Sequence, residues 1–176
     1  MVSSKDMHDW GLRLDDARII GRQDFDDLVR NGCQPTENDV LVTKDGANYL
    51  KHIFVMQCPA DVVLLSSIAI LRPGKRINPH LLAASLKDPA NKERLRSYVT
   101  GAAIPRVILK DFKRFQIVLP SAAVQGAWAR IAEPMAKLCW QLVDRNATLR
   151  ATRDLLLPRL ISGELDVSRV PEPASL

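Results

Sequence analysis

The sequence predicts a mixed α/β (α+β) fold: a small domain with a mixed sheet and short helices, followed by a long C-terminal helix of the coiled-coil type. Three observations predict it. Short stretches rich in Val, Ile and Leu, separated by turn residues, recur in the first 120 residues, as in strands. Helix-start signals such as Asn78-Pro79 lie among them. Apolar residues then recur every seventh position from Met135 to Leu156, which is typical of one face of a long helix.

The first half of the domain is predicted to hold one helix and three strands. The helix covers residues 25–30 and ends at Asn31-Gly32, a helix-stop and turn signal. The strands cover residues 40–43, 52–56 and 67–71. The turn after the first strand contains Gly46, which can take the positive φ that a tight connection requires.

The second half of the domain is predicted to hold two helices and two strands. Asn78 caps a helix that runs to Leu86, and Asn91 caps the next one. Strands are expected at 107–109 and 116–119. A short helix follows over 122–132, and Pro134 should kink or restart it because proline has no backbone N–H to donate.

The long helix should run from Met135 to Leu157, about 35 Å at 1.5 Å per residue. Arg145 and Thr152 interrupt the second row of its apolar seam, so only half of that seam is apolar. An ordinary amphipathic helix packed on its own domain is the alternative. The residues expected to pair with another helix are Met135, Leu138, Leu142, Leu149 and Leu156.

Composition fits one globular domain with an arm. The chain has 176 residues, of which 47% are hydrophobic and 26% charged, enough to bury one core. No apolar run approaches the roughly 20 residues that span a bilayer, and the first residues lack a signal peptide, so we expect a cytoplasmic protein with no membrane partner. Cys33, Cys58 and Cys139 have no zinc-ligand spacing and are expected to be reduced thiols, with no metal site.

The charge is distributed unevenly along the chain. Residues 1–40 carry 5 basic and 9 acidic side chains, residues 41–100 carry 9 and 4, and residues 101–160 carry 10 and 4. A basic excess of this kind raises the local concentration of phosphate groups and favours nucleic-acid binding. The alternative is a basic, solvated surface without a ligand.

Four motifs occur in the same order as in a known family. A strand-like segment at 115–120, followed by Gln125, fits the same order. Residues 38–46 read NDVLVTKDG, residues 66–72 SSIAILR, residues 100–105 TGAAIP and residues 155–164 LLLPRLISGE. They resemble, in order, the "G-D-(I/V)-L-(V/I)-x-x-x-G" strand and turn, the mid-domain strand, the "S-G-x-x-x-P/N" loop and the "L-L-P-x-L-(I/L)-S-G-E" ending of specificity (S) subunits of type I restriction-modification systems. The resemblance covers roughly residues 19 to 167. Asn38 stands where the family usually has glycine, and the front is shorter than a complete recognition domain, so the chain resembles half of an S subunit.

The resemblance implies a different function for each of three segments of the chain. Residues 1–120 would be an N-terminally shortened DNA target-recognition domain, 121–165 a spacer and dimerisation helix with a partner-docking end, and 166–176 a flexible tail. The protein would be a non-catalytic DNA sequence-specificity subunit that directs the methylation (M) subunit, and through it the restriction (R) subunit, to double-stranded DNA. No cofactor is expected in this chain; S-adenosylmethionine, ATP and Mg²⁺ would belong to the partner subunits. A half-subunit would recover the usual pair of helices by forming a homodimer.

Two sets of residues are candidates for these contacts. Arginine can bond guanine through two hydrogen bonds and asparagine can do the same to adenine, whereas lysine more often contacts phosphate. For Tyr49 and His52, a place at the edge of the core is an equally good interpretation. The DNA-binding candidates are Lys44, Asn48, Tyr49, Lys51, His52, Arg72, Lys75, Arg76 and Arg106. The partner-docking candidates are Leu157, Pro158, Leu160, Ile161 and Gly163.

Two other function classes are kept as alternatives. A metal-dependent DNA nuclease would use Asp61 with Asp111 and Lys113 to hold Mg²⁺ and polarise a water molecule. A coiled-coil adaptor without DNA contact would make the basic excess incidental. The sequence has no (N/D)-P-P-(Y/F/W) loop, G-x-G-x-x-G turn or P-loop, so it predicts neither a methyl-donor nor an ATP site.

Overall fold

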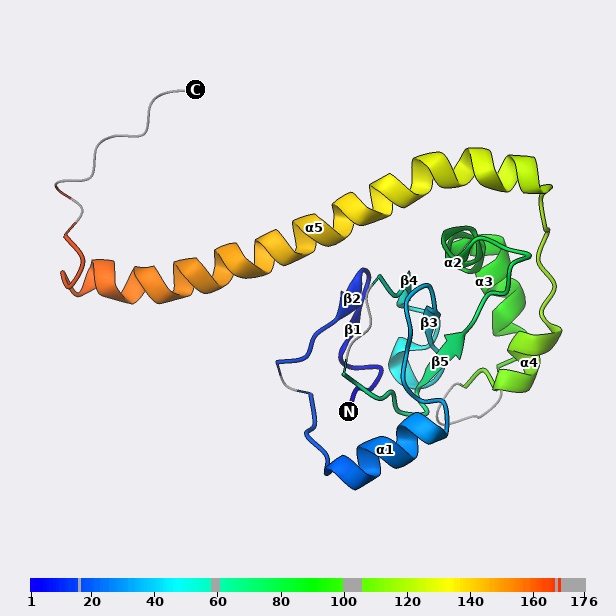
Figure 1. Cartoon of the computed structure of the whole chain (residues 1–176), viewed down its shortest axis with the longest axis horizontal. Coiled ribbons are helices and arrows are strands. Elements are labelled where there is room, and N and C mark those ends of the chain that lie inside the picture. The colour runs from blue at the N-terminus through cyan, green and yellow to red at the C-terminus, as the bar shows by residue number, and fades with distance from the viewer. Residues whose placement is uncertain (16, 58–60, 100–105, 167, 169–176) are drawn as a thin grey trace. The chain divides into compact units, whose positions relative to one another are not determined.

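The computed structural model describes residues 1–15, 17–57, 61–99, 106–166 and 168. The chain separates into two units, Met1–Lys137 and Leu138–Leu176. Figure 1 labels the elements of both. Cys58, the glycine loop at 100–105 and most of the predicted tail at 166–176 lie outside the described residues.

A three-stranded sheet forms the centre of the first unit. It consists of β3 (Val40–Thr43), β4 (Ile53–Val55) and β5 (Ile68–Leu71), in the order β4-β3-β5. The three predicted strands are confirmed to within two residues. The sheet is antiparallel rather than mixed; among the described residues, no crossover helix, which a parallel neighbour usually needs, connects any two of these strands.

One face of the sheet packs against two helices. Val40 and Val42 of β3 are fully buried with Ile53 and Val55 of β4. Helices α2 (Pro79–Lys87) and α3 (Pro89–Arg96) complete this core with Ala83, Leu86 and Leu95. Removing a large apolar side chain of this kind from water stabilises the fold by about 1.5–3 kcal/mol.

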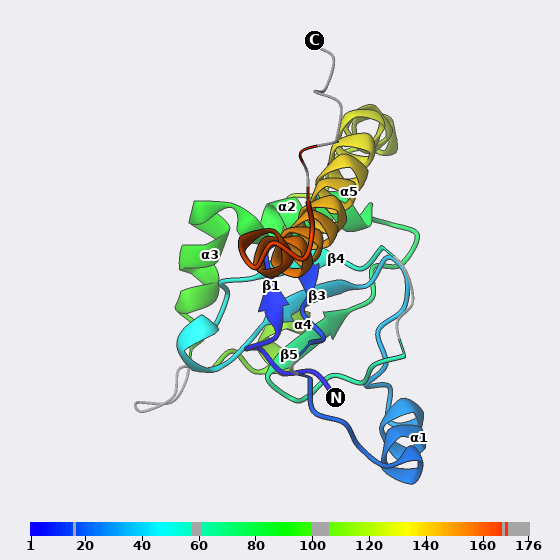
Figure 2. The same cartoon turned by 90° about the vertical axis from the view of Figure 1, so that its left-hand side faces the viewer.

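The N-terminal part adds a hairpin and a helix. Strands β1 (Met7–His8) and β2 (Gly11–Leu12) pair antiparallel. Two-residue strands are too short to show a period of two, so the sequence did not predict them. The predicted first helix is confirmed as α1 (Arg22–Arg30), and Gly32 takes a φ of 75° after it. Figures 1 and 2 both place α1 and α2 at opposite ends of this unit.

The two predicted helix caps have different outcomes. Asn78 caps α2, because its Oδ1 accepts hydrogen bonds from the backbone N–H groups of His80 (2.9 Å) and Leu81 (3.3 Å). The prediction that Asn91 caps the next helix is wrong. Asp88 is the cap: its carboxylate accepts a hydrogen bond from the Asn91 N–H (3.0 Å), and Pro89 takes the first position of α3.

The two strands predicted after α3 are absent from the described residues. Helix α4 (Leu109–Arg114) begins where the first should end, and the Val107 N–H donates to the Lys44 carbonyl oxygen at 2.8 Å without a strand forming. Residues 116–119 have no regular structure, and 86% of the Val118 surface is exposed. No described strand lies beside this segment to accept its backbone hydrogen bonds, so β propensity alone does not make it a strand.

The long helix is longer than predicted. Helix α5 (Ala122–Ile161) has 40 residues, about 60 Å at 1.5 Å per residue. The helix does not restart at Pro134 and continues past Pro158, because each proline removes one backbone bond while the turns on both sides keep theirs. Gly163 follows the last turn as a C-terminal cap: its φ is 74°, and its N–H donates to the Leu160 carbonyl oxygen.

The backbone at Asn38 has a conformation that is uncommon for residues other than glycine. Its φ is 68°, in the left-handed region that favours glycine. Asparagine is among the few other residues that visit this region readily. Asn38 therefore adopts a conformation that usually favours glycine, and it adds an exposed side chain that glycine lacks.

A substitution at Asn38 tests this interpretation. Asn38→Val should lower the free energy of unfolding of the first unit by about 1–2 kcal/mol, because a β-branched side chain clashes with a left-handed backbone. Asn38→Gly should change it little. Urea denaturation of both variants measures the difference, with Glu37→Val at the exposed neighbouring position as control. Equal losses in Asn38→Val and Glu37→Val would contradict the backbone argument.

Candidate nucleic-acid interface

Lys44 and Arg106 share one carboxylate. Only 8% of Lys44 is exposed, and its Nζ lies 3.6 Å from Oδ2 of Asp45. The Nε of Arg106 lies 3.6 Å from the same oxygen, with 54% of the side chain exposed. Lys44 is therefore held inside the unit, which leaves little of it for a ligand, whereas Arg106 reaches solvent beside its partner.

Two of the other candidates near the first turn are also anchored. Tyr49 packs partly buried against the core. The His52 side chain is 12% exposed, and its Nδ1 lies 2.9 Å from Oδ1 of Asp9. Both therefore lie at the edge of the core, as the alternative interpretation holds. Lys51 is exposed, and the side chain of Asn48 in η1 (Gly46–Asn48) is outside the described residues.

Arg72 stabilises the turn before β3. Its Nε lies 3.3 Å from both carboxylate oxygens of Asp39, and its Nη2 donates to the Gln34 carbonyl oxygen at 2.9 Å. The Asp39 side chain is only 3% exposed, so Arg72 neutralises a buried charge. Its guanidinium is thereby committed to the fold.

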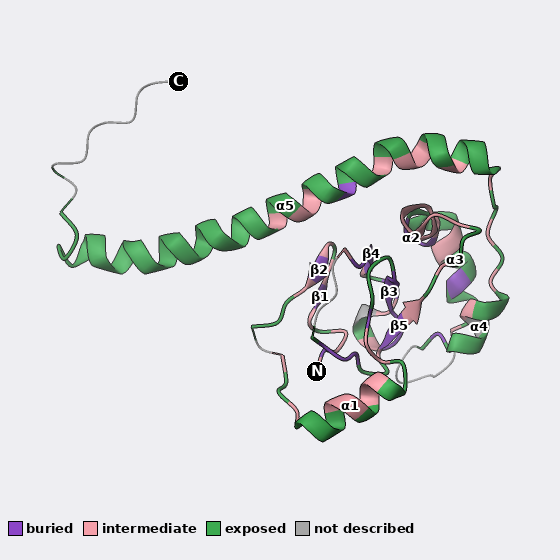
Figure 3. Cartoon of the chain, viewed as in Figure 1, coloured by how far each residue is buried: buried purple, intermediate pink, exposed green. Residues whose placement is uncertain are grey.

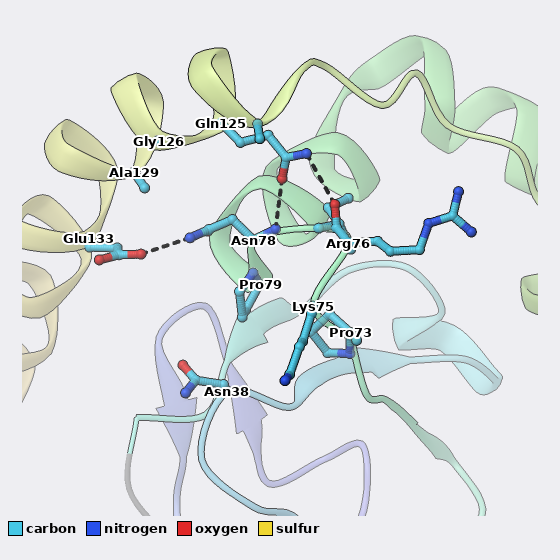
Figure 4. Close-up of a pocket in the computed structure, with 13 residues that line it drawn as sticks. Asn38, Pro73, Lys75, Arg76, Asn78, Pro79, Gln125, Gly126, Ala129 and Glu133 are labelled. Atoms are coloured by element: carbon cyan, nitrogen blue, oxygen red, sulfur yellow. Dashed lines mark hydrogen bonds between the residues drawn. The ribbon is translucent and has the colours of Figure 1, made fainter.

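Lys75 and Arg76 differ from these candidates. Both lie exposed in the loop between β5 and α2, and their side chains make no hydrogen bond or ion pair with the described residues. Figure 4 shows Lys75 extending toward Asn38, whereas the Arg76 guanidinium extends the other way. They are the cations of the predicted set best placed to meet a phosphate.

Gln125 fixes this loop against the start of α5. Its Oε1 accepts a hydrogen bond from the Asn78 N–H (3.0 Å), and its Nε2 donates to the carbonyl oxygens of Arg76 (3.1 Å) and Pro120 (3.0 Å). Both N–H groups of the amide and its oxygen are thus used (Figure 4).

Asn78 joins α2 to α5 a second time. While its Oδ1 caps α2, its Nδ2 donates to Oε1 of Glu133 at 2.7 Å. The first turns of α5 are therefore bonded to the start of α2. The compact unit Met1–Lys137 includes these first turns of α5. The sequence analysis did not identify Gln125 or Glu133 as partners of Asn78.

A groove lies between this junction and the sheet. One part has a volume of about 660 Å³ and is lined by Lys75, Pro73 and Pro79; the adjoining part, about 680 Å³, is lined by Gln57, His80, Arg130 and Lys137. Asn38, Ala129 and Glu133 line both parts. Burial lowers the pKa of His80 below its usual value, against the opposing effect of the Glu133 charge, so His80 is neutral at pH 7.

The apolar seam of α5 is exposed. Beyond Lys137, α5 carries an almost entirely exposed surface in Figure 3. Each helix-pairing candidate is exposed: Met135, Leu138, Leu142, Leu149 and Leu156. The docking candidates Leu157, Leu160 and Ile161 are also exposed, Pro158 lies inside the last turns, and Gly163 caps the helix. The positions predicted to pair or dock are thus uncovered in the single chain, as an interface would require.

The residues named for a nuclease are not brought into a recognisable metal site. Within the described residues, no three His, Cys, Asp or Glu side chains are placed to hold a metal ion together. Asp61 is exposed, and the Asp111 side chain lies outside the described part.

No protein-family model matches the chain, and no curated protein matches it significantly. The resemblance to type I specificity subunits therefore rests on the motifs of this sequence. None of the helices in the described part combines the length and apolar composition that crossing a membrane requires.

The junction at Asn78 yields a prediction about stability. Asn78→Ala should lower the free energy of unfolding of the first unit by about 1–2 kcal/mol, because it removes the cap of α2 and the bond to Glu133. Urea denaturation measures the change. Asn146→Ala, at an exposed position of α5, is the control and should be neutral or slightly stabilising, since alanine is the better helix former. Equal stability of the two variants would show that the junction is dispensable.

Proposed function

We propose that this protein is a DNA sequence-specificity subunit of the type I restriction-modification kind. The observation that carries the proposal is a small sheet-based unit, with unpaired cations in one loop, followed by a 40-residue helix with an exposed apolar seam. The unit would bind double-stranded DNA, and the helix would recruit the proteins that act on that DNA. The order of the sequence motifs supports the same proposal.

In this proposal the chain performs no chemistry. The M subunit would dock on the end of α5, where Leu157, Leu160 and Ile161 are exposed around Pro158. It would supply S-adenosylmethionine, and the R subunit would supply ATP and Mg²⁺. The exposed apolar cluster favours a protein partner, because such groups gain stability when they are removed from water.

A binding selection tests the proposal directly. The full chain is incubated with a pool of random duplex DNA, with and without an M subunit, and the bound fraction is separated on a gel and sequenced. We expect enrichment of one short sequence, made stronger by the M subunit. A pool that stays random in both conditions would contradict sequence specificity.

The first prediction from this function concerns salt. Lys75→Ala together with Arg76→Ala should reduce the dependence of log affinity on log salt concentration by about two, because each lost phosphate contact releases about one counterion fewer. If Arg76 contacts a base, Arg76→Ala alone should cost roughly 1–3 kcal/mol and alter preference at one position.

Fluorescence anisotropy with the selected duplex at several salt concentrations measures this slope. Lys5→Ala with Arg18→Ala removes the same charge from two exposed positions near the N-terminus and is the matched control. If the slope of log affinity against log salt concentration changes equally in both double variants, the loop acts only through net charge and makes no specific phosphate contact.

The second prediction concerns self-association. Leu142→Glu with Leu149→Glu should give a monomer that still folds, because a two-fold pair of helices would then bring four like charges into one interface. Analytical ultracentrifugation at tens of micromolar measures the mass. A two-fold pair would also make the DNA target a palindrome of two identical half-sites. A wild-type chain that is monomeric, both alone and with DNA, would exclude self-pairing.

A further inference from the structure

The groove beside Asn78 contains more unpaired positive charge than the sequence analysis identified. Lys75, Arg130 and Lys137 line it and are exposed, and none of their side chains forms an ion pair with the described residues. Arg130 and Lys137 are seven residues apart and so lie on the same face of α5, two turns from one another.

One acidic residue lies among these cations. Glu133 lines both parts of the groove, and Asn78 Nδ2 donates a hydrogen bond to one of its carboxylate oxygens. Arg76 lines the groove as well, although its guanidinium extends away from Lys75 (Figure 4), so four basic residues against one carboxylate leave the groove net positive. Neutral amide groups of Asn38 and Gln57 line it as well, and these can donate hydrogen bonds to an anion without adding charge.

The groove is also preformed. Gln125 holds one wall through the Arg76 carbonyl oxygen, and Asn78 holds α5 through Glu133. Pro73, Pro79 and Pro134 line it with side chains that lose little conformational entropy when a ligand binds. A ligand therefore meets charges that are already in place, which lowers the cost of binding.

We propose that this groove seats the sugar-phosphate backbone of duplex DNA, with Lys75, Arg130 and Lys137 as its phosphate contacts. The inference rests on the proposed function and extends it: the first turns of α5 bind DNA themselves and do not only connect the recognition unit to its partners. A phosphate is the occupant that the net positive charge favours, and the loop with Lys75 and Arg76 leads directly into the groove.

Two variants, expected to change the affinity for duplex DNA in opposite directions, test the proposal in the full-length chain. Arg130→Ala with Lys137→Ala should weaken binding of the selected duplex roughly tenfold near 0.1 M salt and reduce the salt slope by about two. Glu133→Gln should strengthen binding by on the order of threefold, because it removes a like charge near the phosphates. Glutamine keeps the oxygen that accepts the Asn78 hydrogen bond, so the junction is retained.

Lys5→Ala with Arg18→Ala is again the control of equal charge, and thermal unfolding by circular dichroism verifies that each variant is folded. A wild-type chain that binds no duplex even at low salt would overturn the proposed function and this inference together. If the wild type binds but Arg130→Ala with Lys137→Ala behaves like the control, the function stands and the groove is not part of it. A Glu133→Gln variant that is folded but binds the duplex more weakly than the wild type would also overturn the inference, because glutamine keeps the Asn78 hydrogen bond and removes only the like charge.

Discussion

The arrangement of the first unit depends on the hydrogen bonds between Asn78, Gln125 and Glu133. The sheet and its two helices form a core without α5, because Val40, Ile53 and Leu86 bury one another. The start of α5 buries less: Ala136 is its one buried residue, and Trp128, Ala129 and Ala132 are half-buried. The polar bonds are directional, so they fix where the helix begins as well as holding it there.

The positions of two buried aspartates determine which cations are available. Lys44, Arg72 and Arg106 each lie beside an aspartate that is almost fully buried, because an isolated buried carboxylate is far more costly than a paired one. Lys75, Arg130 and Lys137 lie around backbone and amide groups that already have partners. Their charged groups can therefore interact with water or with a bound anion. The difference between structural and available cations thus follows from where the acids are, and a count of basic residues does not reveal it.

The sequence predicts the local features well and the long-range ones poorly. Strand β3 follows from its β-branched residues, the Asn78 cap from its proline neighbour, and Gly163 from the end of the apolar repeat. Asp88-Pro89 is as good a start signal as Asn78-Pro79, and it could have been preferred to Asn91. Residues 116–119 have the composition of a strand, but no described strand lies beside them. A strand forms only where an adjacent strand pairs with its backbone N–H and C=O groups.

The candidate site shows the same limit. Gln125 lies 47 residues from Asn78 in the sequence, and Glu133 lies 55 residues from it. No period or spacing relates such distant positions, so a single sequence cannot show that they meet.

The exposed seam of α5 has a consequence for how much of this protein a cell can hold. A row of uncovered leucines gains stability from any apolar surface that it meets, and that gain increases with concentration by mass action. A chain produced in excess over whatever covers the seam would pair indiscriminately or aggregate. The exposed seam therefore requires that the amount of this protein match the amount of whatever covers the seam.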